Sequence, residues 1–159
     1  MMRKRKLFKK IFLVFFILFI IAQFFQPEKN NGVADTPTDV THYVTVPADV
    51  MQVLRTSCYD CHSNKTQYPW YSQITPGNFW LANHISDGKK VLNFSEFGSL
   101  SQRKMRSKLS SVAEQVQKRE MPLQSYLFIH RNARLSDSQI KMVTNWADSA
   151  KQELSLKNK

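Results

Sequence analysis

Two cysteines and a histidine lie close together in the sequence Cys58-Tyr59-Asp60-Cys61-His62. Two thiols three residues apart on a helical turn can each add to one vinyl group of the same porphyrin, and the adjacent histidine is then held under the iron. This C-x-x-C-H spacing is the attachment signal of c-type haem. It predicts one covalent haem c, with Cys58 and Cys61 as attachment points and His62 as an iron ligand.

Other chemistry of paired cysteines fits the sequence less well. A structural zinc site needs four ligands, and the chain has no second C-x-x-C or H-x-x-x-H pair. A thioredoxin-like dithiol would follow a strand in a βαβ unit, whereas these cysteines follow a helical pattern. With only two cysteines in the chain, neither has a distant partner for a disulfide framework. The pair therefore favours haem.

A low-spin haem needs a second axial ligand, and Met121 is the first candidate. Pro122 stops the preceding helical pattern and presents Met121 on irregular backbone, from which a thioether can reach iron. Ligation by Met and His raises the haem potential relative to two histidines. The alternative for Met121 is an ordinary packing methionine. His84 is the second candidate for the sixth position.

Aromatic side chains are concentrated between residues 68 and 80. Such a loop can form a wall against a flat porphyrin, and Trp70 is the best candidate there for a hydrogen bond to a haem propionate. An aromatic cluster unrelated to haem is the alternative.

The ordered set of motifs resembles the bacterial haem-binding domain family, a group of single-haem, cytochrome c-like domains. The resemblance covers residues 45–153 and rests on Cys58-Tyr59-Asp60-Cys61-His62-Ser63-Asn64, Tyr68-Pro69-Trp70-Tyr71, His84, Asn93-Phe94-Ser95-Glu96-Phe97, Glu120-Met121-Pro122 and Leu135-Ser136. It implies a haem-binding domain exposed to the periplasm, and it implies no particular reaction. Leu123 stands where such domains often carry a second proline after the Met-Pro pair.

Three helices are expected to position these residues. Pro47 opens the first, in which Val50, Leu54 and Cys58 fall on one face. The second spans residues 101–118, and the third starts at a capping box formed by Ser136 and Gln139. Trp146 in the third helix is placed to pack across the first. The sequence thus predicts an all-α, cytochrome c-like domain over residues 47–155.

The amino-terminal residues predict a membrane anchor. Residues 11–25 contain one polar side chain, Gln23, and follow a basic cluster. A helix over residues 7–25 would be about 28 Å long, close to a bilayer's hydrocarbon core. No small-residue cleavage site follows, so residues 1–26 are interpreted as an uncleaved single transmembrane helix with a cytoplasmic basic tip. Residues 27–46, with two prolines and no helical period, predict a flexible linker.

Charge argues against nucleic acid as a partner. Of 23 Lys and Arg residues, six precede residue 11, and the remaining 17 face 12 acidic residues. That excess is mild and is not interleaved with aromatic residues. A basic side on the middle helix could dock an acidic redox partner protein, which the sequence does not identify, although such a run is more often a solvated face; its residues are Arg103, Lys104, Arg106 and Lys108.

Together these features predict a monohaem cytochrome c of the inner membrane, with its carboxy-terminal domain in the periplasm. We expect an electron carrier rather than a catalyst, because no catalytic acid–base pair is evident. The first alternative is a haem peroxidase or a gas or redox sensor, in which the sixth position is open or its ligand is displaceable. The second is an anchored interaction module that binds zinc or no cofactor.

Overall fold

The computed structural model describes the backbone of residues 2–157 and the side chains of residues 4–157, and this part of the chain is all-α, as the sequence predicts. Its only pairing of extended backbone is an isolated bridge between Asn31 and Lys65. The elements in chain order are α1 (Met2–Ala22), η1 (Val40–His42), α2 (Ala48–Ser57), α3 (Tyr59–His62), η2 (Trp70–Gln73), α4 (Gly77–Val91), η3 (Phe94–Ser99), α5 (Gln102–Gln117), α6 (Gln124–Leu127), η4 (Arg131–Ala133) and α7 (Asp137–Leu156).

The chain forms two compact units. Unit 1 combines the chain up to Lys29 with residues Tyr68–His84, and unit 2 combines Asn30–Gln67 with the chain from Ile85 onward. The backbone passes between the units at three places, the last of them inside α4.

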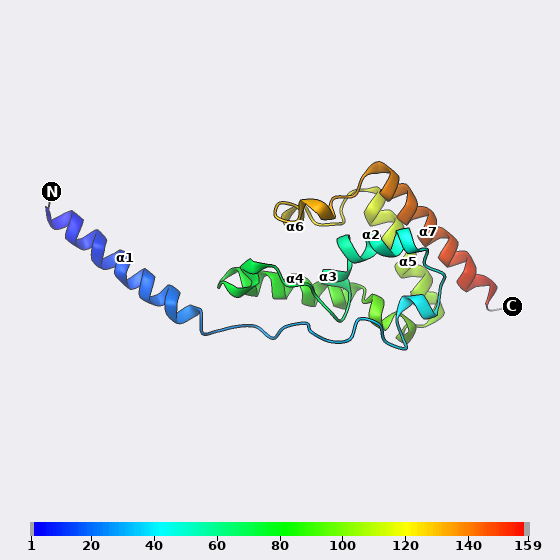
Figure 1. The fold of residues 1–159 in the computed structure, drawn as a ribbon, viewed down its shortest axis with the longest axis horizontal. Helices are drawn as coiled ribbons and strands as arrows, with labels where there is room; N and C mark the ends of the chain where they lie inside the picture. Colours follow the sequence, from blue (N-terminus) through cyan, green and yellow to red (C-terminus); the bar gives the residue numbers. More distant parts are fainter. Residues whose placement is uncertain (1, 158–159) are drawn as a thin grey trace. The chain divides into compact units, whose positions relative to one another are not determined.

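Unit 2 is built around the long helices α5 and α7, which pack side by side, with α2 against α7 (Figure 1). The amphipathic pattern of α5 buries Met105, Leu109 and Val116. The capping box of Ser136 and Gln139 at the start of α7 is present as expected. Trp146 is buried in α7, and its indole Nε1 donates to the Thr45 carbonyl, 3.0 Å away, just before α2. The expected helices are therefore confirmed.

The segment before α2 differs from the flexible linker expected for residues 27–46. From Asn30 onward it belongs to unit 2, and Val40 and Val44 are buried in the core. Asp39 caps η1 by accepting hydrogen bonds from the Thr41 amide and hydroxyl. The sequence did not indicate this packing, because the two buried valines lie among proline and polar residues and are too few to form a periodic pattern.

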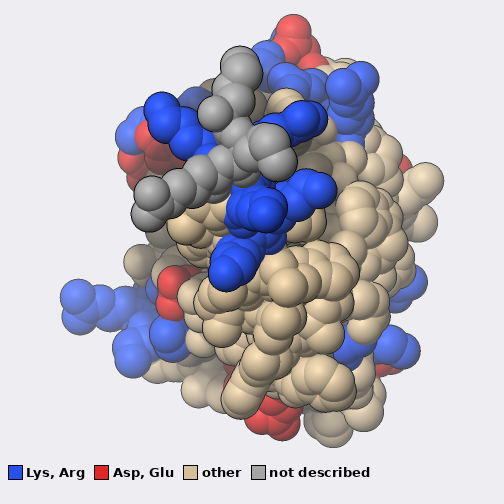
Figure 2. Space-filling view, turned by 90° about the vertical axis from the view of Figure 1, so that its left-hand side faces the viewer, with Lys and Arg blue, Asp and Glu red and all other residues tan. Residues whose placement is uncertain are grey.

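In unit 1, helix α1 starts and ends earlier than the expected span of residues 7–25. It runs from Met2 to Ala22 and so includes the basic cluster. Figure 2, which views the molecule from this end, shows Lys and Arg side chains gathered there. Gln23 follows the last residue of α1, and its side chain bonds the backbone of Thr75: the Thr75 amide donates to Oε1 at 2.9 Å, and Nε2 donates to the Thr75 carbonyl at 3.3 Å. Among the described residues, none of the helices has both the length and the apolar character needed to cross a bilayer.

Candidate haem site

The two cysteines lie on one helical turn of unit 2. Helix α2 ends at Ser57, and after Cys58 the chain turns into α3, where the amides of Cys61 and His62 both donate to the Cys58 carbonyl, at 3.2 and 2.9 Å. Residues three apart on such a turn share a face, so the two thiols project together. Both are free and half-buried, and burial raises the pKa of Cys58 to about 12 and that of Cys61 to about 11. At neutral pH both are protonated thiols.

His62 is held by a carbonyl 30 residues further along the chain. Its Nδ1 lies 2.9 Å from the Leu92 carbonyl oxygen, which can only accept, so Nδ1 carries the proton and donates. Burial lowers the pKa of the imidazole below its ordinary value, despite the hydrogen bonds to the Leu92 and Gly88 carbonyls. The ring is therefore neutral at pH 7, and Nε2 keeps a lone pair for a metal.

Helix α4 reaches the attachment turn through a glycine. A Cβ added at Gly88 would lie 2.7 Å from the Cys61 carbonyl oxygen and 3.1 Å from Cys61 Cβ. Real Cβ atoms do not approach backbone oxygens this closely, so only glycine allows the two backbones to pack at this distance. Gly88 also precedes Leu92 by one helical turn, and its carbonyl accepts the Leu92 amide at 2.9 Å. The same contact thus places the carbonyl that orients His62.

A polar cluster holds the backbone directly after His62. Ser63, fully buried, donates its hydroxyl to the Tyr59 carbonyl at 2.8 Å. The side-chain amide of Asn30 lies 2.9 Å from both the Ser63 carbonyl and the Thr66 hydroxyl, and Lys89 donates to Asn30 Oδ1 at 2.7 Å. Residues from three parts of the chain therefore meet directly after His62.

Asp60, between the two cysteines, links the turn to α6. Its Oδ1 accepts the Gln67 amide at 2.9 Å, and its Oδ2 accepts the Tyr126 hydroxyl at 2.8 Å. The Tyr126 ring stacks on His130, with ring centroids 4.2 Å apart and planes 6° apart. The segment that follows Met121 is in this way joined to the attachment turn.

Comparison with known sequences decides the family. The sequence pattern of the family described as "Haem-binding domain" matches residues 17–149, most of the chain. The chain belongs to the haem-binding domain family. This confirms the resemblance seen in the motifs. Neither a curated protein nor a solved structure gave a match.

The residues of this haem-binding domain fit the cofactor. The iron of a porphyrin binds a neutral imidazole through its unprotonated nitrogen. In His62 this nitrogen is Nε2, because Nδ1 is bonded to the Leu92 carbonyl. Covalent attachment asks for two reduced thiols on one face, and Cys58 and Cys61 supply them. Apolar side chains near α6 are left exposed in unit 2, as expected for a surface that a large apolar cofactor would cover; they are Leu123, Phe128 and Ile129.

Met121, the predicted sixth ligand, lies in the same unit as the attachment turn of the haem-binding domain. It is half-buried on the loop between α5 and α6, where the amides of Glu120 and Met121 both donate to the Gln115 carbonyl, at 2.9 and 3.2 Å. Pro122 follows and is buried. The loop is thus irregular backbone, as the sequence predicts, and the role of Met121 toward iron stays a prediction.

The other two candidates belong to unit 1. His84 lies on α4, where its Nδ1 is 2.8 Å from the Trp80 carbonyl and its ring is 4.3 Å from the Trp80 ring. Trp70 is 74 % exposed and meets Tyr71 edge-on. Their expected roles, as second candidate for the sixth ligand and as propionate donor, stay predictions.

Sequence reasoning missed the residues that orient the haem-binding turn. The Leu92 carbonyl is a backbone group, and so carries no signature in the sequence. Gly88, Asn30 and the pair of Asp60 and Tyr126 act through contacts across 27 to 66 residues of chain. A glycine inside an otherwise helical pattern was the one signal that could have indicated Gly88.

Proposed function

We propose that this haem-binding domain carries one haem c, joined to Cys58 and Cys61, and transfers single electrons. The observation that supports it is the pair of protonated thiols on one turn beside a neutral His62 whose Nε2 is free. Bound haem would supply an iron that changes between the ferrous and ferric states. The chain's own part is to fix the cofactor, orient His62 and shield the site from water.

Attachment needs no oxidant or reductant. Each S–H adds across one vinyl C=C bond, so that sulfur bonds to one vinyl carbon and the proton ends on the other. No group leaves, and the oxidation state of each sulfur is the same in the thioether as in the thiol.

Mass spectrometry and a pyridine haemochrome spectrum test the attachment. The full chain, expressed with a haem c maturation system, should gain the mass of one haem that survives acid extraction. Each single variant, Cys58→Ala or Cys61→Ala, should keep haem through one bond and shift the haemochrome band, and the double variant should lose covalent haem. Covalent haem in the double variant, or none in the wild type, would disprove the proposal.

For the sixth position we propose Met121, with His84 as the competing ligand. Met121 shares unit 2 with His62 and sits on a loop joined to the attachment turn through Tyr126 and Asp60. A thioether is a soft ligand that favours reduced iron, in keeping with a carrier rather than a catalyst.

We also propose that α1 holds the protein at the inner membrane, with unit 2 in the periplasm. The apolar half of α1 is exposed from Ile11 to Ile21, and it follows a basic end that suits anionic lipid head groups. Bacterial haem attachment to thiols outside the cytoplasm agrees with this side of the membrane.

Fractionation tests the anchor. The full chain should remain in the membrane pellet after a high-salt wash, and protease added to spheroplasts should digest unit 2. Ile17→Asp, in the apolar half of α1, should release much of the protein, because a carboxylate there costs about 3 kcal/mol to insert. Val33→Asp, at an exposed apolar residue of unit 2, is the matched control and should change nothing. Equal retention of both variants would contradict the anchor.

A further inference from the structure

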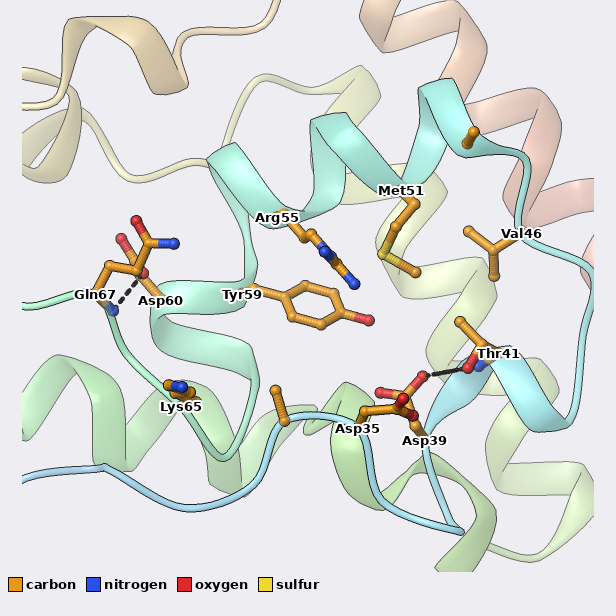
Figure 3. A pocket seen from close by; sticks show the side chains of 12 residues that line it. Asp35, Asp39, Thr41, Val46, Met51, Arg55, Tyr59, Asp60, Lys65 and Gln67 are labelled. Carbon is orange, nitrogen blue, oxygen red and sulfur yellow. Dashed lines mark hydrogen bonds between the residues drawn. The ribbon is translucent and has the colours of Figure 1, made fainter.

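A cavity of about 540 Å³ lies in unit 2 beside the attachment turn (Figure 3). Its walls come from the segment before α2, from α2 itself and from α3 with the loop that follows. Tyr59 and Asp60, the two residues between the cysteines, line it, and the described wall does not include Cys58, Cys61 or His62. The cavity is therefore distinct from the haem site, although it shares the same helical turn.

The Tyr59 hydroxyl is an unpaired polar group in this cavity. Tyr59 is 8 % exposed, and within the described chain its hydroxyl oxygen is buried without a hydrogen-bond partner. The ring stacks on Phe94, with centroids 5.2 Å apart and planes 10° apart, which holds the hydroxyl in place. Figure 3 shows it pointing into the space between Met51 and Asp39. Buried hydroxyls normally have a partner. Because this oxygen has almost no accessible surface in the ligand-free chain, a ligand atom would bond it once the side chains that cover it shift.

Opposite charges face each other across the same space. Arg55 extends from α2 on one wall, and Asp35 and Asp39 lie on the other (Figure 3). Among the described ion pairs Arg55 has none, so its guanidinium and these carboxylates are too far apart to meet directly. A ligand that carries both charges can bridge them.

The two acidic residues differ in how they are held. Asp39 is 3 % exposed, and its Oδ1 accepts from the Thr41 amide at 3.0 Å and the Thr41 hydroxyl at 2.7 Å. The Asp35 side chain is 84 % exposed and lies 3.5 Å from His42 Nε2. Burial raises the pKa of Tyr59, and the Asp39 carboxylate raises it further against the opposing Arg55. The hydroxyl is thus a protonated donor at physiological pH.

We propose that this cavity binds a free α-amino acid with an apolar side chain. The carboxylate lies toward Arg55 and accepts from the Tyr59 hydroxyl, and the ammonium group lies toward Asp35 and Asp39. Val46 and Met51 line the cavity with them and receive the apolar side chain. The volume is within the range of small-molecule pockets. This site is independent of the proposed electron transfer.

Calorimetric titration of the full-length, haem-loaded protein in detergent with L-leucine tests the proposal. L-Leucinamide lacks the carboxylate and 4-methylpentanoate lacks the ammonium group, so each should bind at least about tenfold more weakly than L-leucine, as the loss of a charge-assisted hydrogen bond implies. Absence of L-leucine binding at millimolar concentration, or equal binding of all three compounds, would overturn it.

Variants assign the binding to this cavity. Arg55→Gln and Asp35→Asn change exposed side chains, so they should fold normally and weaken L-leucine binding about tenfold. Arg103→Gln, an exposed cation on α5, is the matched control and should bind as the wild type does. Unchanged binding in both cavity variants would overturn the site.

Tyr59→Phe separates a ligand-binding hydroxyl from a merely structural tyrosine. Removing an unpaired buried hydroxyl should leave the ligand-free protein at least as stable in thermal unfolding. The same variant should bind L-leucine several-fold more weakly. Unchanged binding in Tyr59→Phe would mean that the hydroxyl makes no contact with the ligand, and the proposed orientation would be wrong.

Discussion

The attachment turn and the Met121 loop are both part of unit 2, but they are held in different ways. The turn is held by contacts with other parts of the chain. The Leu92 carbonyl bonds His62, the backbone of Gly88 packs on Cys61, and a polar cluster holds Ser63. The Met121 loop is fixed mainly through its own backbone, by two amides on the Gln115 carbonyl. The difference teaches that His62 is oriented before any cofactor arrives, whereas Met121 is placed by a loop that bonds mainly to its own backbone.

The largest expected effect comes from closing the space at Gly88. Gly88→Ala would gain about 1 kcal/mol of helix propensity, but its Cβ would meet the Cys61 carbonyl oxygen at 2.7 Å. Because that oxygen belongs to the backbone and cannot rotate away, we expect a net loss of about 1–3 kcal/mol in unfolding free energy and a lower yield of covalent haem. Denaturant unfolding and the haemochrome yield measure both.

Gly77→Ala is the matched control on the same helix. A Cβ there would meet only ordinary contacts, the nearest at 3.4 Å from the Tyr71 carbonyl. If both variants behaved alike, the close approach of α4 would not be what fixes the turn.

Met121→Ala tests the other side of the comparison. If the thioether closes the sixth position, its loss should produce a high-spin spectrum, rapid carbon monoxide binding to the reduced form and a potential lower by an amount on the order of 0.1 V, within the roughly 0.8 V range that axial ligands cover. Optical spectra and potentiometry provide the measurements. Stability should fall little, since Met121 is only half-buried.

Met142→Ala and His84→Ala are the comparisons for this variant. Met142, on α7, should leave the spectrum unchanged. A spectral change in His84→Ala instead of Met121→Ala would indicate ligation by two histidines. Rapid carbon monoxide binding by the unmutated protein would favour a sensor or peroxidase over a carrier.

Tyr126→Phe removes the link between the two regions. The variant loses one hydrogen bond to the Asp60 carboxylate, worth about 1 kcal/mol in a part-buried setting. If that link also positions the Met121 loop, the low-spin spectrum expected from Met ligation should weaken. His62 should stay bound to the iron. Leu156→Ala, an exposed change at the end of α7, is the control. An unchanged spectrum in Tyr126→Phe would mean that the regions are structurally independent.

We expect the smallest effect on unfolding free energy from a substitution of Glu153, near the end of α7. The Thr45 amide donates to its carboxylate at 2.9 Å, and this bond, with Lys157, lowers the pKa of Glu153. A lowered pKa in the folded state contributes stability above the unfolded pKa, and that stability is lost as pH falls through the folded pKa. Glu153→Gln should therefore cost under about 1 kcal/mol near pH 7 and reduce the loss of stability that acidification through the pKa of this carboxyl causes.

Glu114→Gln is the control for this pH dependence. Glu114 pairs with Lys118 on the exposed side of α5, and the pKa of its carboxyl is lowered by that pair alone. Its loss should alter the pH dependence of unfolding less than Glu153→Gln does. A larger change at Glu114 would mean that the bond to the Thr45 amide contributes little.

The sequence predicted what is local. The C-x-x-C-H turn, the helix found at Gln102–Gln117 and the cap at Ser136 follow from spacings within a few residues. It did not predict that α1 ends at Ala22, or that the next residue, Gln23, bonds Thr75, 52 residues away. It did not predict that residues 30–46 pack into unit 2, because the bonds of Asn30 to Ser63 and Thr66 span more than 30 residues.

The three chain crossings between the units carry a mechanical consequence. They fall after Lys29, after Gln67 and after His84. Asn30 binds Ser63 and Thr66, the Gln67 amide binds Asp60, and Gly88 rests against Cys61. Each of the three backbone connections between the units therefore enters unit 2 within four residues of a contact with the attachment turn. Tension applied to unit 1 would reach unit 2 through these connections. A pull on the amino-terminal helix is a load on the segment that holds the two thiols and His62.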